Sequence, residues 1–144
     1  MSRDEVDEFV AGRETGVLTL ARNDEPYSVP ISYGYDGSKG TFYMRLVSTP
    51  ESEKRAFLDA SPDARLVIYD SNADRTAYWS VVADGSLEEL DPADLSVDQI
   101  EQYGQTYRPL FEIWGQERDE LDIRLYEFEP ERISGRRTEI DREL

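Results

Sequence analysis

The chain of 144 residues contains no cysteine, no histidine and only two lysines. Without thiols and imidazoles, the sequence excludes thiolate metal sites, cysteine nucleophiles, histidine bases and histidine metal ligands. We therefore expect no metal centre. Any chemistry must use carboxylates, arginine, lysine, tyrosine, hydroxyl groups or a bound cofactor.

Long hydrophobic runs are also absent. No apolar run approaches the ~20 residues that span a bilayer, and the N-terminal segment MSRDEVDEF lacks the apolar core of a signal peptide. We expect a cytoplasmic protein with no membrane contact. The length fits a single domain covering residues 1–144, and the sequence contains no internal repeat or low-complexity tract.

The charge is strongly one-sided. Acidic residues outnumber basic ones 32 to 16, which gives a formal charge of -16. Such a surface repels nucleic-acid phosphates and anionic lipids, so we expect neither as a partner. An acidic, lysine-poor composition resembles that of proteins from extreme halophiles, where salt screens the carboxylates. With 38% hydrophobic and 11% aromatic residues, the chain has enough apolar side chains to fold.

Capping residues and helical periodicity predict about three helices. The first has Ser2 and Glu5 at capping-box spacing and ends near Gly12. The second and third follow the capping residues Thr49 and Ser96. They span about 1–13, 50–60 and 96–114.

Apolar runs rich in β-forming residues predict the strands. Three runs between residues 16 and 46, separated by turn segments at 23–25 and 36–40, predict an antiparallel meander. Pro30 inside the second run indicates an edge strand, a bulge or a strand side that faces a ligand. Further strands are expected at 64–70, 76–82 and 121–130, with a bulge at 84–85 through which the strand could continue, and a polar, partly loose tail at 130–144.

The order of these elements lacks βαβ alternation. It therefore favours a mainly β (α+β) fold, a small antiparallel barrel flanked by about three helices, over a doubly wound sheet.

The stretch TFYMRLVSTPESEKRAFL, residues 41–58, predicts a strand that runs into a helix start rich in hydroxyl groups. A helix start favours a phosphate through its free N–H groups and its dipole. Lys54 would add a point charge and Arg45 a fork of donors. The alternative is that Thr49 and Ser52 only cap the helix and Lys54 is solvated; we favour a cap for Thr49 and a ligand role for Lys54.

The order of elements, together with three short segments, resembles the FMN-binding split β-barrel proteins related to pyridoxamine 5′-phosphate oxidase. The segments are Val29-Pro30-Ile31-Ser32, Tyr43-Met44-Arg45, and Ser48-Thr49 followed by Glu51-Ser52-Glu53-Lys54. The resemblance covers about residues 5–136, and no single segment is diagnostic. Glu53 beside the expected phosphate departs from the family pattern, as does Arg45 where many relatives carry histidine.

The resemblance implies bound FMN, with the deazaflavin F420 as an alternative, and a homodimer in which each flavin lies at the subunit interface. The cofactor contacts that it implies are Arg45, Ser48, Thr49, Ser52, Lys54, Pro30, Ile31, Ser32 and Trp79. For Trp79, packing in the core is the simpler interpretation.

The expected function is flavin binding, with flavin-dependent oxidoreductase activity on an unknown substrate. The sequence argues against the pyridoxamine-phosphate oxidase reaction itself, since the chain has no histidine to help hold a second phosphate. The alternatives are a flavin- or nucleotide-binding module without catalysis and a deazaflavin-dependent reductase. The cofactor carries the electron transfer in such enzymes, so the lack of histidine and cysteine does not forbid catalysis.

The charge balance generates a first prediction. We expect the thermal unfolding midpoint to fall when the protein is moved from high to low salt, because the screening length grows from ~3 Å at 1 M to ~30 Å at 0.01 M salt. Circular dichroism melts across a salt series measure it. A midpoint that does not change on dialysis would contradict the halophilic interpretation.

Overall fold

The computed structural model describes residues 1–48, 56–58, 63–91, 93, 95–97 and 122–140. Within these residues one helix and seven strands are defined: α1 (Arg3–Ala11), β1 (Thr15–Arg22), β2 (Glu25–Ser32), β3 (Gly34–Asp36), β4 (Thr41–Ser48), β5 (Asp63–Ser71), β6 (Ala77–Leu90) and β7 (Asp122–Glu139). None of the described helical segments has the length and apolar character of a membrane span.

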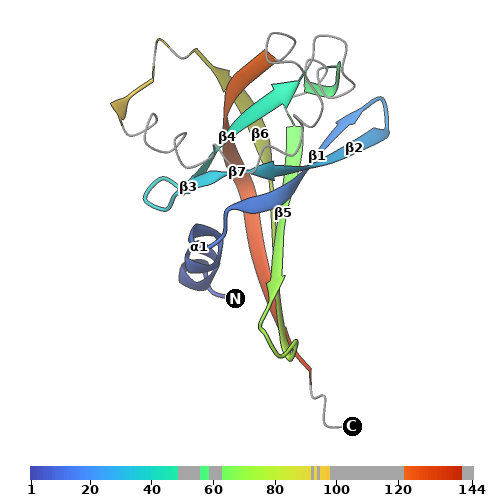
Figure 1. Cartoon of the computed structure of the whole chain (residues 1–144), viewed down its shortest axis with the longest axis vertical. Helices are drawn as coiled ribbons and strands as arrows, with labels where there is room; N and C mark the ends of the chain where they lie inside the picture. Colours follow the sequence, from blue (N-terminus) through green and yellow to red (C-terminus); the bar gives the residue numbers. More distant parts are fainter. Residues whose placement is uncertain (49–55, 59–62, 92, 94, 98–121, 141–144) are drawn as a thin grey trace.

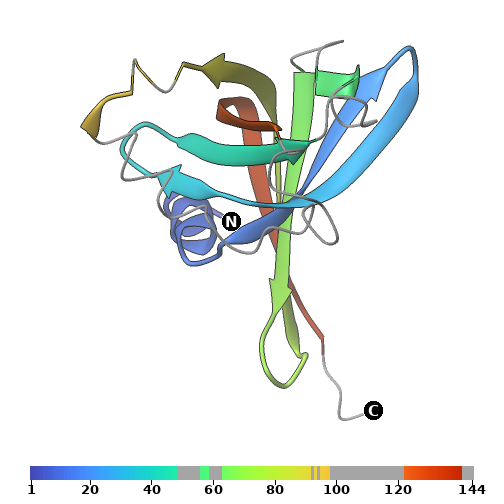
Figure 2. The ribbon, with the colours of Figure 1, turned by 45° about the horizontal axis from the view of Figure 1, so that its top comes forward.

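All seven strands form one antiparallel sheet in the order β2-β1-β5-β6-β7-β4-β3. The two edge strands, β2 and β3, follow one another in the chain with only Tyr33 between them. Because a single residue links the two edges, the sheet must curl until they meet. Figures 1 and 2 show this curled sheet from two directions. The expected antiparallel barrel fold is confirmed.

The meander predicted for the first three runs is only partly correct. The first pairing, β1 with β2, is present, but β4 pairs with β3 and β7, and the other neighbour of β1 is β5. The second run divides at Tyr33 into two strands at opposite edges of the sheet, which a flat meander does not allow. Of the three interpretations of Pro30, the structure shows the edge strand, since β2 is an edge strand of the sheet.

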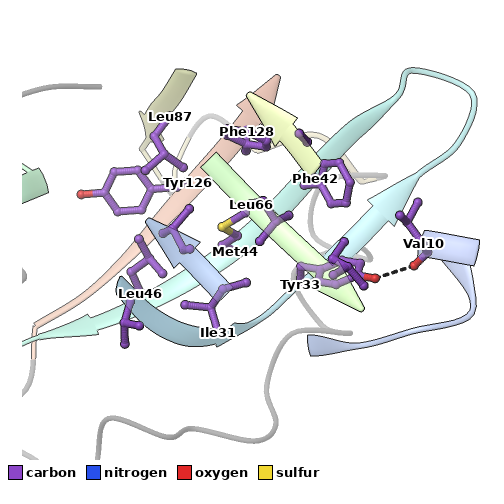
Figure 3. Packing of buried hydrophobic residues seen from close by; sticks show 14 of the residues in the cluster. Val10, Ile31, Tyr33, Phe42, Met44, Leu46, Leu66, Leu87, Tyr126 and Phe128 are labelled. Atoms are coloured by element: carbon purple, nitrogen blue, oxygen red, sulfur yellow. Dashed lines mark hydrogen bonds between the residues drawn. The ribbon is translucent and has the colours of Figure 1, made fainter. Parts of the chain in front are cut away.

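Helix α1 forms as its sequence predicts. The Ser2 hydroxyl accepts a hydrogen bond from the Glu5 N–H, the Glu5 side chain accepts one from the Ser2 N–H, and Gly12 follows as C-cap. The buried stripe of Val6, Phe9 and Val10 faces the barrel. Figure 3 shows the bond that fixes this end of the helix, donated by the Tyr33 hydroxyl to the Val10 carbonyl at 2.6 Å.

The barrel interior is an apolar core with contributions from all sides of the curled sheet. Leu18, Ile31, Met44, Leu66 and Phe128 are each at most 1% exposed. Several of these side chains converge in Figure 3 from strands that are distant in the sequence. Since apolar side chains fill this interior, polar or charged ligands can bind only at the outer face of the sheet or at its edges.

Two local features have the backbone that their residues predict. Asn23 and Asp24 have φ of 50° and 66°, which suits the two-residue turn between β1 and β2. The register of β6 against β7 shifts between Asp84 and Gly85, so β6 continues through the predicted bulge to Leu90. A Cβ on Gly85 would overlap the Glu129 carbonyl group of β7.

The C-terminal segment differs from its prediction. Residues 130–139 were expected to be partly loose, but they continue β7 and pair with β6 as far as Glu139 opposite Ala77. The tail is thus more regular up to Glu139 than its composition predicts, because polar side chains do not prevent a strand from pairing at a solvated part of a sheet. Residues 141–144 and most of the predicted helices at 50–60 and 96–114 lie outside the described residues, although 56–58 are helical.

The bulge generates the second prediction. Gly85→Ala should lower the free energy of unfolding by about 1–3 kcal/mol, because the added methyl group overlaps the main chain of β7. Gly37→Ala is the matched control, since its Cβ would meet only the Tyr35 ring, at 3.7 Å. Urea unfolding followed by circular dichroism measures both. Equal stability of the two variants would contradict this role of Gly85.

Candidate functional site

The strand β4 divides its side chains between the core and the outer face of the sheet. Phe42, Met44 and Leu46 alternate into the core and are at most 1% exposed. Tyr43 and Arg45 therefore lie on the opposite, outer face. This alternation places the first of the predicted phosphate ligands outside the filled interior.

Arg45 has an unusual environment for a charged side chain. It lies opposite Leu125 of β7 and is half-buried. Its Nε atom is buried and has no hydrogen-bond partner in the structure described here. An unsatisfied buried donor costs about 1–3 kcal/mol, and more when it is charged. A polar or anionic group that accepted this N–H would remove the cost.

We call the predicted phosphate ligands Arg45, Ser48, Thr49, Ser52 and Lys54 the phosphate cradle. Those after Arg45 lie at the end of β4 or directly follow it in the chain. Ser48 is its last residue and its main chain pairs with Asp122. Thr49, Ser52 and Lys54 lie outside the described residues. Their proposed contacts therefore stay predictions from the sequence.

The three predicted contacts in β2 have different environments. Pro30 is exposed on the outer face opposite Val17. Ile31 is 1% exposed in the core, so a contact of Ile31 with a cofactor would have to use its main chain. Ser32 is 5% exposed at the end of the strand, beside the Tyr33 link to β3.

Trp79 packs in a column that joins α1 to the sheet. Its ring stacks on Phe9 at 6.4 Å between centroids, and the Arg137 guanidinium lies 5.5 Å from its centroid. The Arg13 guanidinium also lies 4.0 Å from the Phe9 ring centroid, and its Nε donates a hydrogen bond to Asp70 at 3.2 Å. These contacts are what the packing interpretation of Trp79 predicts.

The structure does not bring Trp79 and Arg45 together within one chain. Their partners on β7 are Arg137 and Leu125. Positions 125 and 137 are separated by about 40 Å along the strand, at ~3.3 Å per residue. The two side chains therefore lie beside opposite ends of β7.

Sequence reasoning missed a carboxylate cluster next to Arg45. Glu127 lies between Tyr43 on one neighbouring strand and Glu88 on the other, with Glu129 two residues further along. Burial raises the pKa of Glu127, and the charges of Glu129 and Glu88 raise it further, against lowering by the Tyr43 hydrogen bond and by Lys39. The alternation EFE places Glu127 and Glu129 on one face, but the sequence does not reveal the register that brings Glu88 opposite.

This cluster generates the third prediction. Since the folded pKa of Glu127 lies above its unfolded value near 4.5, stability should fall as the pH rises from about 4 through the folded pKa. Glu127→Gln should therefore raise the free energy of unfolding at pH 7 by a few tenths to about 1 kcal/mol, with little change below pH 4.

Denaturant unfolding at several pH values measures this difference, with Glu131→Gln, at an exposed residue of the same strand, as the control. Parallel pH profiles for the wild type and Glu127→Gln would reject the assignment.

Solved structures with this fold come from several organisms. An FAD-binding protein of Mesorhizobium loti superposes with a TM-score of 0.70 at 23% identity, covering 95% of this chain and 93% of that one. An FAD-binding protein of Mycobacterium smegmatis has a TM-score of 0.67 at 13% identity, covering 98% of both chains. A heme-binding protein of the same organism has a TM-score of 0.65 at 14% identity, covering 95% of this chain and 57% of that one. At these identities the likeness establishes the fold.

Sequence comparison is more specific. An uncharacterized protein of Rhizobium meliloti (strain 1021) is 32% identical over 90 residues, which are 62% of this chain and 56% of that protein. The chain thus spans just over half of the length of this relative. The family described as pyridoxamine 5′-phosphate oxidase matches residues 2–137, which is nearly the whole chain and agrees with the resemblance seen in its motifs. The chain therefore belongs to the pyridoxamine 5′-phosphate oxidase family.

Proposed function

We propose that this protein binds FMN with its phosphate at the end of β4, and that it is a flavin-dependent oxidoreductase. The observation that carries the proposal is the buried Nε of Arg45, which has no hydrogen-bond partner within the described structure. It lies on the strand that leads into the hydroxyl-rich segment containing Ser48, Thr49, Ser52 and Lys54.

Arg45 differs from other arginines of this acidic chain. Arg65 forms a bidentate pair with Asp84, at 2.6 and 3.1 Å, and Arg13 bonds to Asp70. On β7, Glu127 lies two residues from the partner of Arg45, and its carboxylate accepts a hydrogen bond from Tyr43. An arginine Nε that no described residue accepts, in a chain of charge -16, supports a role in holding an external anion.

The residues around this anion would bind and orient the cofactor. Arg45 would donate Nε–H to a phosphate oxygen, while Ser48 and the residues after it would supply hydroxyl and main-chain donors. Bound flavin supplies hydride and electron transfer, and the protein supplies position and electrostatics. This division of roles explains how a chain without histidine or cysteine could support redox chemistry.

Flavin fits the available side chains better than heme. Two relatives in fold bind FAD and one binds heme. Heme iron is most often held by histidine or cysteine, and this chain has neither. Flavin needs a phosphate cradle rather than an axial ligand, which supports the flavin proposal. F420 carries a phosphate too, so a deazaflavin-dependent reductase is the alternative cofactor choice.

We also propose a homodimer with the flavin at the subunit interface. Support comes from the separation of Arg45 and Trp79 by about 40 Å along β7. If Trp79 or its neighbours contact a flavin held at Arg45, this separation favours their coming from the second copy. In such a dimer, Arg45 of one subunit and Trp79 of the other would contact the same flavin.

The fourth prediction tests the cradle. Arg45→Gln and Lys54→Ala should each weaken FMN binding about 10- to 100-fold, because each removes a charge-assisted contact of ~1.5–3 kcal/mol. Lys39→Ala is the control, since Lys39 lies in the turn before β4 and should leave the affinity unchanged. Fluorescence titration of FMN in high salt measures the affinities.

Several outcomes would count against the proposal. Equal affinities for Lys54→Ala and Lys39→Ala would reject the cradle. A protein that is colourless and takes up neither FMN nor F420 would reject the cofactor assignment. Bound flavin that no nicotinamide donor reduces would favour a binding module without catalysis.

A further inference from the structure

The hairpin of β1 and β2 carries an aromatic and a cationic side chain near its turn. Tyr27 lies opposite Leu20, and Arg22 lies opposite Glu25. Because side chains alternate along a strand, Tyr27 shares the inner face of the hairpin with the buried Val29. Tyr27 also packs against the apolar core, so the core extends along the hairpin towards its turn.

Phe57 covers this end of the hairpin. Its side chain is 1% exposed, and its ring stacks on the Tyr27 ring with 5.2 Å between centroids and 18° between planes. The Arg22 guanidinium lies 4.9 Å from the centroid of the same Phe57 ring. We call Arg22, Tyr27 and Phe57 the aromatic clamp. Figures 1 and 2 show the short green segment 56–58 beside the β1–β2 hairpin.

The contact of Arg22 is not the one that its charge alone would favour. Glu25 lies directly opposite it on β2, yet no ion pair joins these two described residues. The guanidinium lies over the Phe57 ring instead, where its flat shape and cation–π attraction favour contact. In a chain with 32 acidic residues, this preference indicates a specific contact with the segment that carries Phe57.

The aromatic clamp holds the chain next to the phosphate cradle. The strand β4 ends at Ser48, whose main chain pairs with β7. The chain between Ser48 and Phe57 contains three residues of the phosphate cradle, Thr49, Ser52 and Lys54. Strand pairing therefore holds the chain before these three residues, and the aromatic clamp holds it after them.

The spacing of Lys54 and Phe57 strengthens this connection. Lys54 precedes Phe57 by three residues. On the helix that the sequence predicts at 50–60, this spacing would place the two residues next to one another on one face. A displacement of Phe57 would then displace Lys54 as well. Because a charge-assisted contact needs donor and acceptor ~2.7–2.9 Å apart, even a small displacement would weaken it.

We propose that Tyr27 and Arg22 are positioning residues for the cofactor phosphate, an inference that rests on the function proposed above. They hold the Phe57 ring against the hairpin and so fix the chain that presents Ser52 and Lys54. In this role neither residue needs to touch the phosphate. The aromatic clamp reduces the conformational freedom that the phosphate cradle loses on binding, and such preorganisation raises affinity without a new contact to the ligand.

A comparison of two flavins separates positioning from packing. Riboflavin has the same ring system as FMN and lacks the phosphate. If the aromatic clamp only stabilised the fold, its loss would affect the binding of both flavins alike or of neither. If it positions the phosphate cradle, its loss weakens the binding of FMN alone.

The fifth prediction applies this comparison to Tyr27. Tyr27→Ala should weaken FMN binding about 3- to 10-fold, as expected for the loss of an aromatic pair, and leave riboflavin affinity unchanged. Tyr27→Phe keeps the ring and should keep the wild-type FMN affinity. Tyr35→Ala is the matched control and should keep the wild-type ratio of the two affinities, since Tyr35 is also half-buried and packs on Phe42 at 4.6 Å, outside the aromatic clamp. Fluorescence titration in high salt measures each affinity.

A second variant tests the aromatic clamp without removing a ring or a charge. Arg22→Lys loses the flat guanidinium over Phe57 and should weaken FMN binding about 2- to 5-fold, again without an effect on riboflavin. It carries the test alone if Tyr27→Ala does not fold.

Three results would overturn the inference. They are a wild-type FMN-to-riboflavin ratio in Arg22→Lys and Tyr27→Ala, an equal loss of affinity for both flavins, and a loss in Tyr27→Phe as large as that in Tyr27→Ala. Wild-type protein that binds FMN and riboflavin equally well would instead reject the phosphate cradle itself, and with it the proposed function on which the inference rests.

Discussion

Closure of the sheet through Tyr33 is the constraint on which the other features of this fold depend. The strands β2 and β3 are the two edges of the seven-stranded order, and Tyr33 alone separates them in the chain. Its N–H bonds to the Glu14 carbonyl at 2.9 Å and its hydroxyl to the Val10 carbonyl at 2.6 Å, which ties the closure point to α1. Burial raises the pKa of Tyr33, so the hydroxyl keeps the proton that it donates. Because closure fills the barrel interior with apolar side chains, we expect a polar ligand to bind on the outer face of the sheet.

Local chemistry explains which parts of the fold could be predicted. Four features each depend on one or two residues whose backbone conformation is restricted or whose side chain bonds to the main chain. They are the cap at Ser2, the turn at Asn23, the edge position of Pro30 and the bulge at Gly85. Strand order was not predictable in this way. The pairing of β1 with β5, and the position of β7 between β6 and β4, depend on contacts between residues far apart in the sequence.

The same distinction applies to the candidate site. Alternation in β4 predicts that Arg45 and Tyr43 share a side of the strand, and the structure places both opposite the core residues. The neighbours of Arg45 across the sheet could not be read from the sequence, because the registers of β4 on β7 and of β6 on β7 join residues far apart in the chain. Glu88 therefore meets Glu127 only through the folded sheet. For the segment containing Lys54, the sequence remains the basis of the prediction.

Charge restricts where this chain can hold an anion. In a chain of charge -16, a bound phosphate needs a cationic donor that is not already taken by a carboxylate. The Nε of Arg45 is such a donor, because it is buried and no described residue accepts its N–H. The acidic cluster around Glu127 lies on the same face of the sheet, two residues along β7 from the partner of Arg45. The proposed phosphate site therefore requires Arg45 and the segment that follows β4 to outweigh the repulsion of these carboxylates.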